Sequence, residues 1–550
     1  MKNIFCAAIL ILFSCSIFSQ DNTVGTISID NDVYDGYTLF SSHFNTFLIN
    51  NCGQVVNQWT SEYLPGHSVY ILPNGNLIRA GRKDTSSIIF GGVGGIIEMF
   101  DWDGNLVWEF IYSDNDNRLH HDIYPMPNGN ILVLAANVMT NEEAILAGRD
   151  PDKLGREPDH PDGVLYNEKI LEIKPIGSSQ FTIEWEWNFK DHLIQDFDNT
   201  KNNFGVVADH PEKLDVNFLN DRDPAANWLH VNSIQYDETL DQIVISSRNL
   251  SEVYIIDHST TTEQAATGTG GIYGKGGDFL YRWGNPDAYR RGNSTNRTLY
   301  GQHFPHYIKP GLKNAGKIIV FNNGANRQPV FSDVIIFTPP TSSPGFYNYT
   351  PGTAYGPENV DFQYASTEDN NFTSGILSGA IMLPNDNILI CDGNSGRFVE
   401  INSENEVVWD YIIPMNNATG EIATQGNIIN GNSTFRGIKY SKSYAGFVGK
   451  DLTPGDPIET NFNLNPCTAL SNEEVALNNF KIYPNPVKNE LNLNINQDIT
   501  GIEIFNILGK KLNNIQIDNN KVNLSQVKPG VYILKVQTSK GMIAKKFVKN

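Results

Sequence analysis

Residues 120–135 read HHDIYPMPNGNILVLA, which is an alternating strand, a Pro-Asn-Gly turn and a second, apolar strand. Two such runs separated by an Asn-Gly turn are typical of a β-hairpin. The same pattern recurs in HSVYILPNGNLIRAG (67–81) and GAIMLPNDNILICDG (379–393). Recurrence of one unit predicts a repeat architecture, which reaches this length by addition rather than by enlarging one core.

Each hairpin is followed by two more strands that end on an aromatic residue, as in RFVEINSENEVVWDY (397–411). Four antiparallel strands are the composition of a propeller blade. Two further units with longer turns begin at His230 and His303. The N-terminal unit has only three predicted strands, and FRGIKYSKSYAG (435–446) near the C-terminus can supply the missing first strand of that unit. We therefore predict an all-β fold with a six-bladed β-propeller, closed by pairing of N- and C-terminal strands, which removes the sheet edge.

The charge distribution divides the 550-residue chain into two parts. It has 61 acidic and 40 basic side chains and a formal net charge of −21, which argues against a nucleic-acid partner. Residues 473–550 contain 11 Lys and 6 acidic residues (+5), so the remainder carries −26. The predicted organisation is a signal peptide at 1–20, the propeller at 24–455, a linker at 456–472 and a small β-sandwich at 473–550.

The N-terminus, MKNIFCAAILILFSCSIFSQ (1–20), has a lysine, then an apolar run, and ends in small residues of the kind that precede a cleavage site. This pattern is typical of a secretory signal peptide, and the alternative is a lipoprotein anchor at Cys15. No other window approaches the ~20 apolar residues of a membrane helix. Cys52, Cys391 and Cys467 would remain after cleavage; Cys52–Cys467 is one conceivable disulfide, but the sequence leaves the pairing open.

Equivalent positions of successive blades converge on the propeller axis, and this places three histidines together. Aligning the hairpin turns puts His120, His230 and His303 at the start of three innermost strands, with Asn232 two residues after His230. Arg248 lies at the far end of the hairpin that starts at His230. Since antiparallel neighbours are ~5 Å apart, we expect both residues at the same rim.

This set of side chains favours chemistry on an anionic group. Three histidines also suit zinc, but a guanidinium next to a divalent cation is electrostatically unfavourable. Arginine binds oxyanions such as sulfate or phosphate in a bidentate manner, and imidazole can act as a nucleophile. The pattern indicates transfer of an anionic group to one histidine while the others stabilise the developing charge. No metal and no cofactor are expected.

Residues 25–455 resemble the bacterial arylsulfate sulfotransferase family in the motifs LHHD (119–122), LHVNS (229–233), GQHFP (301–305) and FRGIKYSKSYAGFVGKDL (435–452). The resemblance implies sulfuryl transfer from a phenolic sulfate ester to another phenol, without a nucleotide sulfate donor. It implies that His303 becomes sulfated while His120, His230 and Arg248 hold the sulfuryl oxygens. The LHHD motif contains a second histidine, His121, that could be the one facing the propeller channel. The register of the blades favours His120 for this position. His306 and Asn232 are expected to contact the substrate or to pack nearby.

The C-terminal part resembles the sorting domain of the type IX secretion system. The resemblance lies in the ordered series YPNP (483–486), IFNILGKK (504–511), GVYILKV (530–536) and KKFVKN (545–550). It implies that type IX machinery is a partner and that the protein is secreted or bound to the cell surface. The sequence does not predict an oligomeric state.

Two other classes of function stay open. One is a non-catalytic surface propeller that binds sulfated glycans or other anionic ligands in the same basic pocket. The other is a metal-dependent lyase or hydrolase. The remaining histidines, including His67, are expected to be ordinary surface or core residues. A helix-like segment, DHLIQDFDN (191–199), is expected in an excursion on one face.

Overall fold

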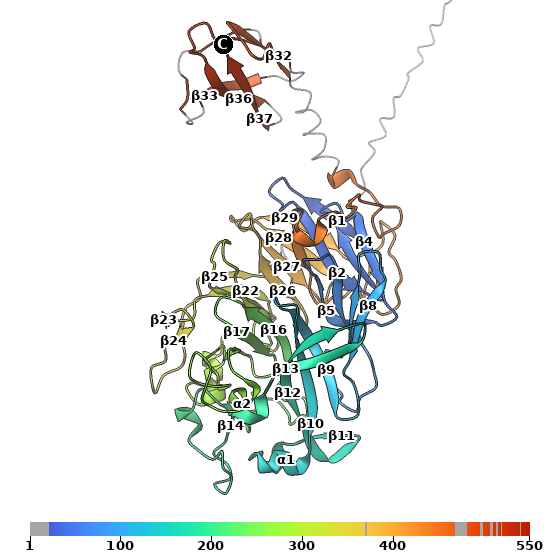
Figure 1. Cartoon of the computed structure of the whole chain (residues 1–550), viewed down its shortest axis with the longest axis vertical. Helices are drawn as coiled ribbons and strands as arrows, with labels where there is room; N and C mark the ends of the chain where they lie inside the picture. Colours follow the sequence, from blue (N-terminus) through green and yellow to red (C-terminus); the bar gives the residue numbers. More distant parts are fainter. Residues whose placement is uncertain are drawn as a thin grey trace, which may run out of the picture. The chain divides into compact units, whose positions relative to one another are not determined.

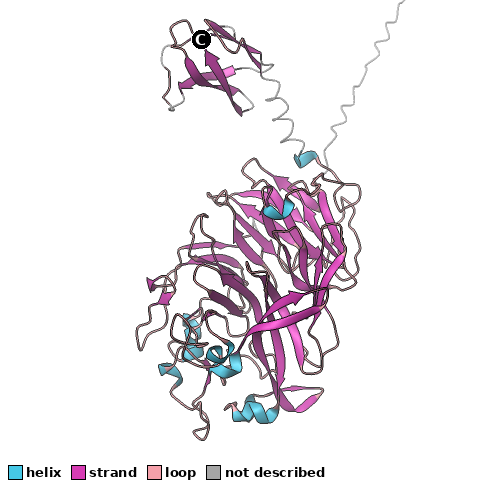
Figure 2. Ribbon diagram, in the orientation of Figure 1, coloured by secondary structure: helices cyan, strands magenta, loops and turns pink. Residues whose placement is uncertain are grey.

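The computed structural model describes residues 21–368, 371–467, 481–494, 499–506, 510–512, 515–518, 520–538 and 541–550. The chain divides into two compact units, one ending at Phe462 and the other spanning Asn463–Asn550. In both units β-strands are the predominant regular structure, joined by loops and a few short helices (Figure 2). The predicted signal peptide, residues 1–20, lies outside the described residues.

The first unit contains a series of antiparallel sheets that follow one another along the chain (Figure 1). The first three are β30–β2–β3–β4 (Ile438–Ser441, Gly36–Ser42, Asn45–Ile49, Val55–Thr60), β5–β6–β7–β8 (Pro65–Ile71, Leu77–Arg82, Gly95–Phe100, Leu106–Ile111) and β9–β10–β12–β13 (Asn117–Pro125, Ile131–Met139, His160–Ile176, Gln180–Asn188), with the short β11 (Gly155–Glu157) added to β12.

The next three are β16–β17–β18–β19 (Val231–Asp237, Gln242–Ser247, Glu252–Asp257, Tyr281–Trp283), β20–β21–β22–β25 (His303–Tyr307, Ile318–Asn322, Asp333–Phe337, Phe362–Ala365) and β26–β27–β28–β29–β1 (Gly379–Met382, Ile388–Asp392, Arg397–Ile401, Val407–Ile412, Gly25–Ile29). Smaller pairs form between β14 and β15 (Leu193–Ile194, Leu214–Asp215) and between β23 and β24 (Thr341–Ser343, Phe346–Tyr347). The two short α-helices described are α1 (Asn141–Leu146) and α2 (Thr262–Ala265).

The two ends of this unit are tied into sheets formed by the opposite end. The C-terminal β30 pairs with β2, with Tyr37 opposite Tyr440, and the N-terminal β1 pairs with β29. The pairing that the sequence predicted between three N-terminal strands and one C-terminal strand is therefore present. It leaves neither β2 nor β29 as a free edge.

Each sheet packs against the next one. The first strands of successive sheets contact one another in the order β2, β5, β9, β16, β20 and β26. The last sheet in turn meets the first through a shared apolar cluster that contains Phe40 and Phe398, and through an ion pair of 2.7 Å between Lys439 Nζ and Glu400 Oε2. Apolar side chains therefore fill the spaces between adjacent sheets.

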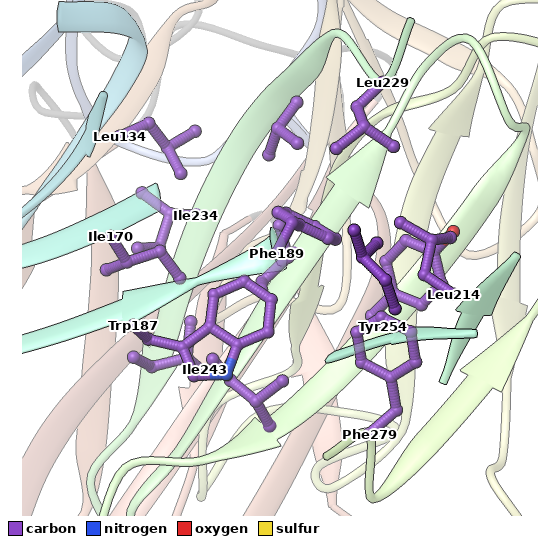
Figure 3. Packing of buried hydrophobic residues seen from close by; sticks show 14 of the residues in the cluster. Leu134, Ile170, Trp187, Phe189, Leu214, Leu229, Ile234, Ile243, Tyr254 and Phe279 are labelled. Atoms are coloured by element: carbon purple, nitrogen blue, oxygen red, sulfur yellow. The ribbon is translucent and has the colours of Figure 1, made fainter. Parts of the chain in front are cut away.

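The largest of these clusters lies between the third and fourth sheets (Figure 3). Ile170 of β12 and Ile243 of β17 meet there, together with Trp187. Leu229, which immediately precedes His230, is buried in the same cluster. Complete burial of one such side chain contributes about 1.5–3 kcal/mol. The start of β16 is thus fixed by packing directly beside a candidate site residue.

The helix expected over residues 191–199 is not formed, and that prediction was wrong. A 3-10 turn at Phe189–His192 leads into β14 instead. Gln195 Oε1 accepts hydrogen bonds from the backbone NH groups of Phe197 and Asp198, both at 2.7 Å. Such local side-chain-to-backbone bonds offer an alternative to the helical ladder.

The second unit has two small sheets around one core. They are β31–β32–β35–β34 (Lys481–Tyr483, Glu490–Asn494, Lys521–Asn523, Gln516–Asp518) and β33–β36–β37 (Ile499–Asn506, Gly530–Thr538, Gly541–Lys549). Leu491 and Val522 from the first sheet share an apolar cluster with Leu534 and Phe547 from the second. The two sheets therefore face each other, as in a β-sandwich.

Cys52 and Cys467 are each disulfide-bonded, whereas Cys391 is free and buried. In the part of the chain that the structure describes, none of the helices has the length and apolar character needed to cross a bilayer.

Candidate active site

A backbone irregularity at the first strand of several sheets turns side chains toward one cluster. His67, His121 and His230 have positive φ angles of 100°, 52° and 50°, and each lies at a register shift or directly beside one. Phe304 and Ser378 hold the same conformation, at 57° and 86°. Bulges of this kind re-aim side chains and are common beside active sites. Repetition of the bulge explains why histidines from separate sheets converge.

The structure brings together the histidines that the sequence singled out. His121 Nε2 lies 2.9 Å from His230 Nε2. The ring of His120 is centred 5.1 Å from that of His230, and the ring of His303 is centred 6.2 Å from that of His121. His120, His121 and His303 are at most 4% exposed. Both histidines of LHHD belong to the cluster, so the motif supplies two rings rather than one.

The hydrogen bonds of His230 define where its proton lies. Asn227 Nδ2 is 2.8 Å from His230 Nδ1, and an amide NH₂ can only donate. The proton of neutral His230 is therefore on Nε2, where it points at His121 Nε2. His230 presents an N–H donor to the centre of the cluster.

His120 is held from both sides. Its Nδ1 is 2.8 Å from Glu168 Oε2, and its Nε2 is 3.0 Å from the carbonyl oxygen of Gly91. The other oxygen of Glu168 accepts a hydrogen bond from the backbone NH of Val231 at 2.8 Å. A carboxylate and a carbonyl are both acceptors, so both ring nitrogens of His120 are engaged by the protein. Glu168 thus fixes His120 and, through Val231, the strand that follows His230.

His303 has an orienting partner in Asn323. Asn323 Nδ2 donates to the carbonyl oxygens of Ser374 (2.7 Å) and Leu377 (3.0 Å), so the opposite end of the amide is an acceptor. His303 Nδ1 lies 2.7 Å from Asn323 Oδ1 and therefore carries the proton. The lone pair of neutral His303 is consequently on Nε2. An imidazole oriented in this way by a third group is the arrangement expected of an activated nucleophile or base.

Arg248 lies beside His230, as the hairpin geometry requires. Its backbone NH donates to the carbonyl oxygen of His230 at 3.1 Å. Its guanidinium makes long bonds to Asn249 Oδ1 (3.4 Å) and to the carbonyl oxygen of Gly375 (3.3 Å), and it pairs with no carboxylate among the described residues. This leaves charged N–H groups for an anionic ligand.

Two aromatic rings border the cluster. Phe90 is centred 4.0 Å from His120, and Phe435 is centred 5.6 Å from His121 and 6.4 Å from His303. Phe435 immediately precedes Arg436, which forms a bidentate ion pair with the buried Asp122 at 2.7 and 2.9 Å. The ion pair holds the segment that carries Phe435 against β9.

A glycine-rich loop lies directly on the histidines. The backbone NH of His121 donates to the carbonyl oxygen of Gly92 at 2.9 Å. A Cβ atom on Gly92, which has a φ of +81°, would overlap the His121 ring. Gly91 accepts from His120, as described above. The loop requires small residues here because imidazoles occupy the space.

Two other predicted residues lie outside the cluster. Asn232 is fully buried, and its Nδ2 donates to the carbonyl oxygen of Gln302 at 2.7 Å, one residue before His303. His306 Nδ1 is 3.0 Å from the carbonyl oxygen of Phe304. Asn232 therefore supports the backbone at His303, and His306 interacts locally.

His67 is the main residue that sequence reasoning missed. Its ring stacks on His121, with a centroid distance of 4.8 Å and an interplanar angle of 26°, and it lies 5.0 Å from Phe435. A signal for it was present, because HSVYILPNGN and HHDIYPMPNGN align with His67 opposite His121. Asn323 follows the strand that pairs with the His303 strand, a relation like that of Arg248 to His230, whereas Asn227 and Glu168 had no comparable signal.

Electrostatics keep most of these imidazoles neutral. Burial, and then the charge of Arg248, lower the pKa of His303 to about 3, although the hydrogen bond to Asn323 opposes the shift. Burial, and then neighbouring cationic groups, lower the pKa of His67 to about 3 and hold the pKa values of His121 and His230 well below the usual range. Neutral imidazoles offer lone pairs as well as N–H donors.

A metal ion fits this arrangement less well than an anion. His120, His121 and His230 have ligand atoms within 4.8 Å of one another. However, both nitrogens of His120 are engaged by Glu168 and Gly91, and Arg248 adds positive charge beside His230. The donors that face the cluster suit the oxygens of a sulfuryl or similar group.

The family assignment agrees with this site. The model of the arylsulfotransferase (ASST) family matches residues 30–334, which is more than half of the chain. The chain belongs to the arylsulfotransferase family. Residues 481–550 match the secretion system C-terminal sorting domain, which identifies a type IX sorting domain. The match supports secretion or a location at the cell surface.

No curated protein matches the chain. Among solved structures, a protein of unknown function from Bacteroides caccae is 11% identical, with 69% of this chain and 94% of that chain covered and a TM-score of 0.37. A catalytically inactive virginiamycin B lyase from Staphylococcus aureus is also 11% identical (65% and 72% covered, TM-score 0.30). The Swd1 β-propeller domain from Myceliophteria thermophila is 9% identical (72% and 90% covered, TM-score 0.31). These likenesses are too weak to carry an argument.

Proposed function

We propose that the first unit is a closed six-bladed β-propeller and that it works as an aryl-sulfate sulfotransferase. It transfers a sulfuryl group from a phenolic sulfate ester to a phenolic acceptor by a ping-pong route through sulfo-His303, without a nucleotide sulfate donor. The six sheets, their successive contacts and the paired chain ends support the propeller.

The observation that carries the reaction is the orientation of His303. Asn323 fixes the proton on Nδ1, so that the Nε2 lone pair is available to attack sulfur. In the first half-reaction the Nε2–S bond forms as the bond from sulfur to the aryl oxygen breaks, and the phenolate leaves with the bonding pair. A neutral imidazole needs no prior deprotonation for this step.

The remaining polar groups stabilise the transferring sulfuryl group. His230 presents its Nε2–H, and Arg248 supplies charge without a competing carboxylate among the described residues; His120, held by Glu168, would bind a sulfuryl oxygen by exchanging its Nε2 contact with the Gly91 carbonyl. Donors fixed in advance in a buried site stabilise developing charge more strongly than water does. Loss of one such donor costs about 10²–10³-fold in rate.

The rings of Phe90 and Phe435 suit an aryl substrate. Phe90 lies beside His120, and Phe435 lies beside His121 and His303. Offset or edge-on packing against an aromatic ligand contributes about 0.5–1.5 kcal/mol beyond area burial. Because the chain carries a type IX sorting domain, we expect the protein to be exported in a signal-peptide-dependent manner. Its natural donors and acceptors are then expected to be phenolic compounds outside the cell.

The test is phenol-dependent release of 4-nitrophenol from 4-nitrophenyl sulfate. Wild-type protein should transfer the sulfuryl group to added phenol, and His303→Ala should lose this activity by at least about 10³-fold. His210→Gln is the matched control, because His210 is a surface residue whose Nδ1 bonds only to Glu212. Binding of sulfated compounds without turnover would contradict the proposal and would favour a recognition module. Activity lost to chelators would favour a metal enzyme.

A further inference from the structure

The local backbone conformation at His67 places its side chain in the histidine cluster. It has a φ of 100° within the register shift at the start of β5. Left-handed backbone is costly for a residue other than glycine and persists where the surroundings impose it. The preceding residue, Gly66, lies close to the backbone of the next strand. A Cβ atom at this position would lie 2.7 Å from the carbonyl oxygen of Gly81, so the close approach requires a glycine.

The next residue anchors this turn to the neighbouring sheet. Ser68 Oγ donates to Asp122 Oδ1 and lies 3.3 Å from the carbonyl oxygen of His121. Asp122 is itself fixed by its ion pair with Arg436. The turn that carries His67 is therefore joined to the strand that carries His121, and the stacking of the two rings follows from this connection.

The imidazole of His67 has hydrogen-bonding capacity that the protein does not use. Neither ring nitrogen has a hydrogen-bond partner among the described residues, while His120, His230 and His303 all have orienting partners. The ring is half-buried and lies 5.0 Å from Phe435. A polar group kept partly buried without a partner is costly unless a ligand or water completes its bonds.

We propose that His67 binds the acceptor phenol: its ring nitrogen accepts the hydrogen bond of the phenolic hydroxyl while Phe435 packs against the aryl ring. The inference rests on the proposed ping-pong function and assigns a residue to its second half. In that half-reaction the phenolic oxygen forms an S–O bond as the Nε2–S bond of sulfo-His303 breaks, and the bonding pair returns to Nε2. The phenolic proton passes to the lone pair of His67 and from there to water.

The neutral state of His67 fits this role. Burial, followed by the charges of His120, Arg82 and Arg436, lowers its pKa to about 3, so its lone pair is free at neutral pH. A weak base is sufficient for a proton that becomes strongly acidic only as the S–O bond forms. The donor 4-nitrophenyl sulfate does not need this contact, because its leaving group is a stabilised phenolate that departs without taking up a proton.

The experiment separates the two half-reactions in His67→Asn, since asparagine tolerates left-handed backbone. The burst of 4-nitrophenol from 4-nitrophenyl sulfate without acceptor should stay within about twofold of wild type. The kcat/KM for added phenol should fall about 10²-fold. His67→Gln is the second variant, in case the first does not fold, and should show the same selective loss.

Ser68→Ala is the matched control, because it loosens the same turn and keeps the imidazole. It should change both half-reactions equally or leave both unchanged. An equal fall of both half-reactions in the His67 variants, or an unchanged kcat/KM for phenol, would overturn the assignment of His67. Absence of any burst in the wild-type protein would instead overturn the proposed function, so the two failures are distinguishable.

Discussion

At the scale of single residues, the protonation state of His303 decides how the protein responds to pH. Burial and the charge of Arg248 lower the pKa of His303 to about 3, well below the usual value. A group whose pKa is lowered in the folded protein stays neutral down to that lowered value. His303, the proposed nucleophile, is therefore neutral throughout the mildly acidic range.

We expect kcat/KM for 4-nitrophenyl sulfate to vary less than about threefold between about pH 5 and 8, measured under acceptor saturation. An unperturbed histidine would make it fall below pH ~6.5. A decline of kcat/KM with a midpoint near the ordinary histidine pKa would contradict the described surroundings of His303.

The sequence identified some site residues and not others, for physical reasons. His120, His230 and His303 follow from the repeat, because equivalent positions of a repeated unit converge in space. Arg248 follows from antiparallel pairing with the strand after His230. Glu168 contacts His120 across 48 residues of the chain, and a single sequence carries no signal for such a contact. Asn323 follows the strand paired with the His303 strand, as Arg248 follows the strand paired with that after His230, and it was not singled out. His67 did have the repeat signal, and it was interpreted as an ordinary histidine.

At the scale of elements, the glycine-rich loop before β7 positions the histidines. Gly92→Ala places a Cβ atom against the His121 ring and should displace it, because the loop backbone is held by its bond to His121. We expect a loss of about 10²-fold in transfer activity, as for other small misplacements of reacting groups. The measurement is phenol-dependent release of 4-nitrophenol.

Gly104→Ala is the control for backbone strain. Gly104 has a φ of +87°, close to that of Gly92, but no atom lies within 4 Å of an added Cβ. Both variants should lose about 1–2 kcal/mol of stability from the left-handed backbone. Only Gly92→Ala should lose activity; equal losses of activity would show that the contact with His121 has no role.

The sequence predicted strands correctly where the alternating hairpin pattern was strong. It did not predict the structure of segments whose conformation depends on tertiary contacts. The hairpins that start at β5, β9 and β26 follow the quoted repeats. The segment around His192 did not form its expected helix, because His192 Nδ1 pairs with Asp278 Oδ1 at 2.7 Å and Gln195 bonds to local backbone. The contact between His192 and Asp278 joins residues far apart in the chain, whereas the bonds of Gln195 satisfy local backbone in a non-helical turn.

At the scale of the whole molecule, one buried ion pair links the C-terminal closing segment to the third sheet. Arg436 and Asp122 are each at most 2% exposed. Asp122→Asn leaves the guanidinium buried without a counter-charge and should lower the free energy of unfolding by about 3–5 kcal/mol. Urea denaturation of the full chain measures this change.

Asp35→Asn is the comparison, because Asp35 pairs with Lys442 and the two side chains are 73% and 51% exposed. Exposed pairs contribute about 0–1 kcal/mol. A loss for Asp122→Asn no larger than that for Asp35→Asn would show that the buried pair does not hold the closing segment.

The order of the sheets and the pairing of the chain ends followed from the repeat. The division into an acidic body and a basic C-terminal part indicated two units, which the structure also has. The excursion around residues 191–199 was expected, but its structure was not predictable, because the excursions between sheets lack periodicity and depend on packing against the body.

His303 is proposed to carry the sulfuryl group between donor and acceptor. Mass spectrometry of peptides from protein incubated with 4-nitrophenyl sulfate and no acceptor measures this directly. One added sulfuryl group is expected on His303, and it should disappear when phenol is added before digestion. A sulfuryl group on His120, His121 or His230 instead, or turnover with no modified histidine, would contradict this proposal.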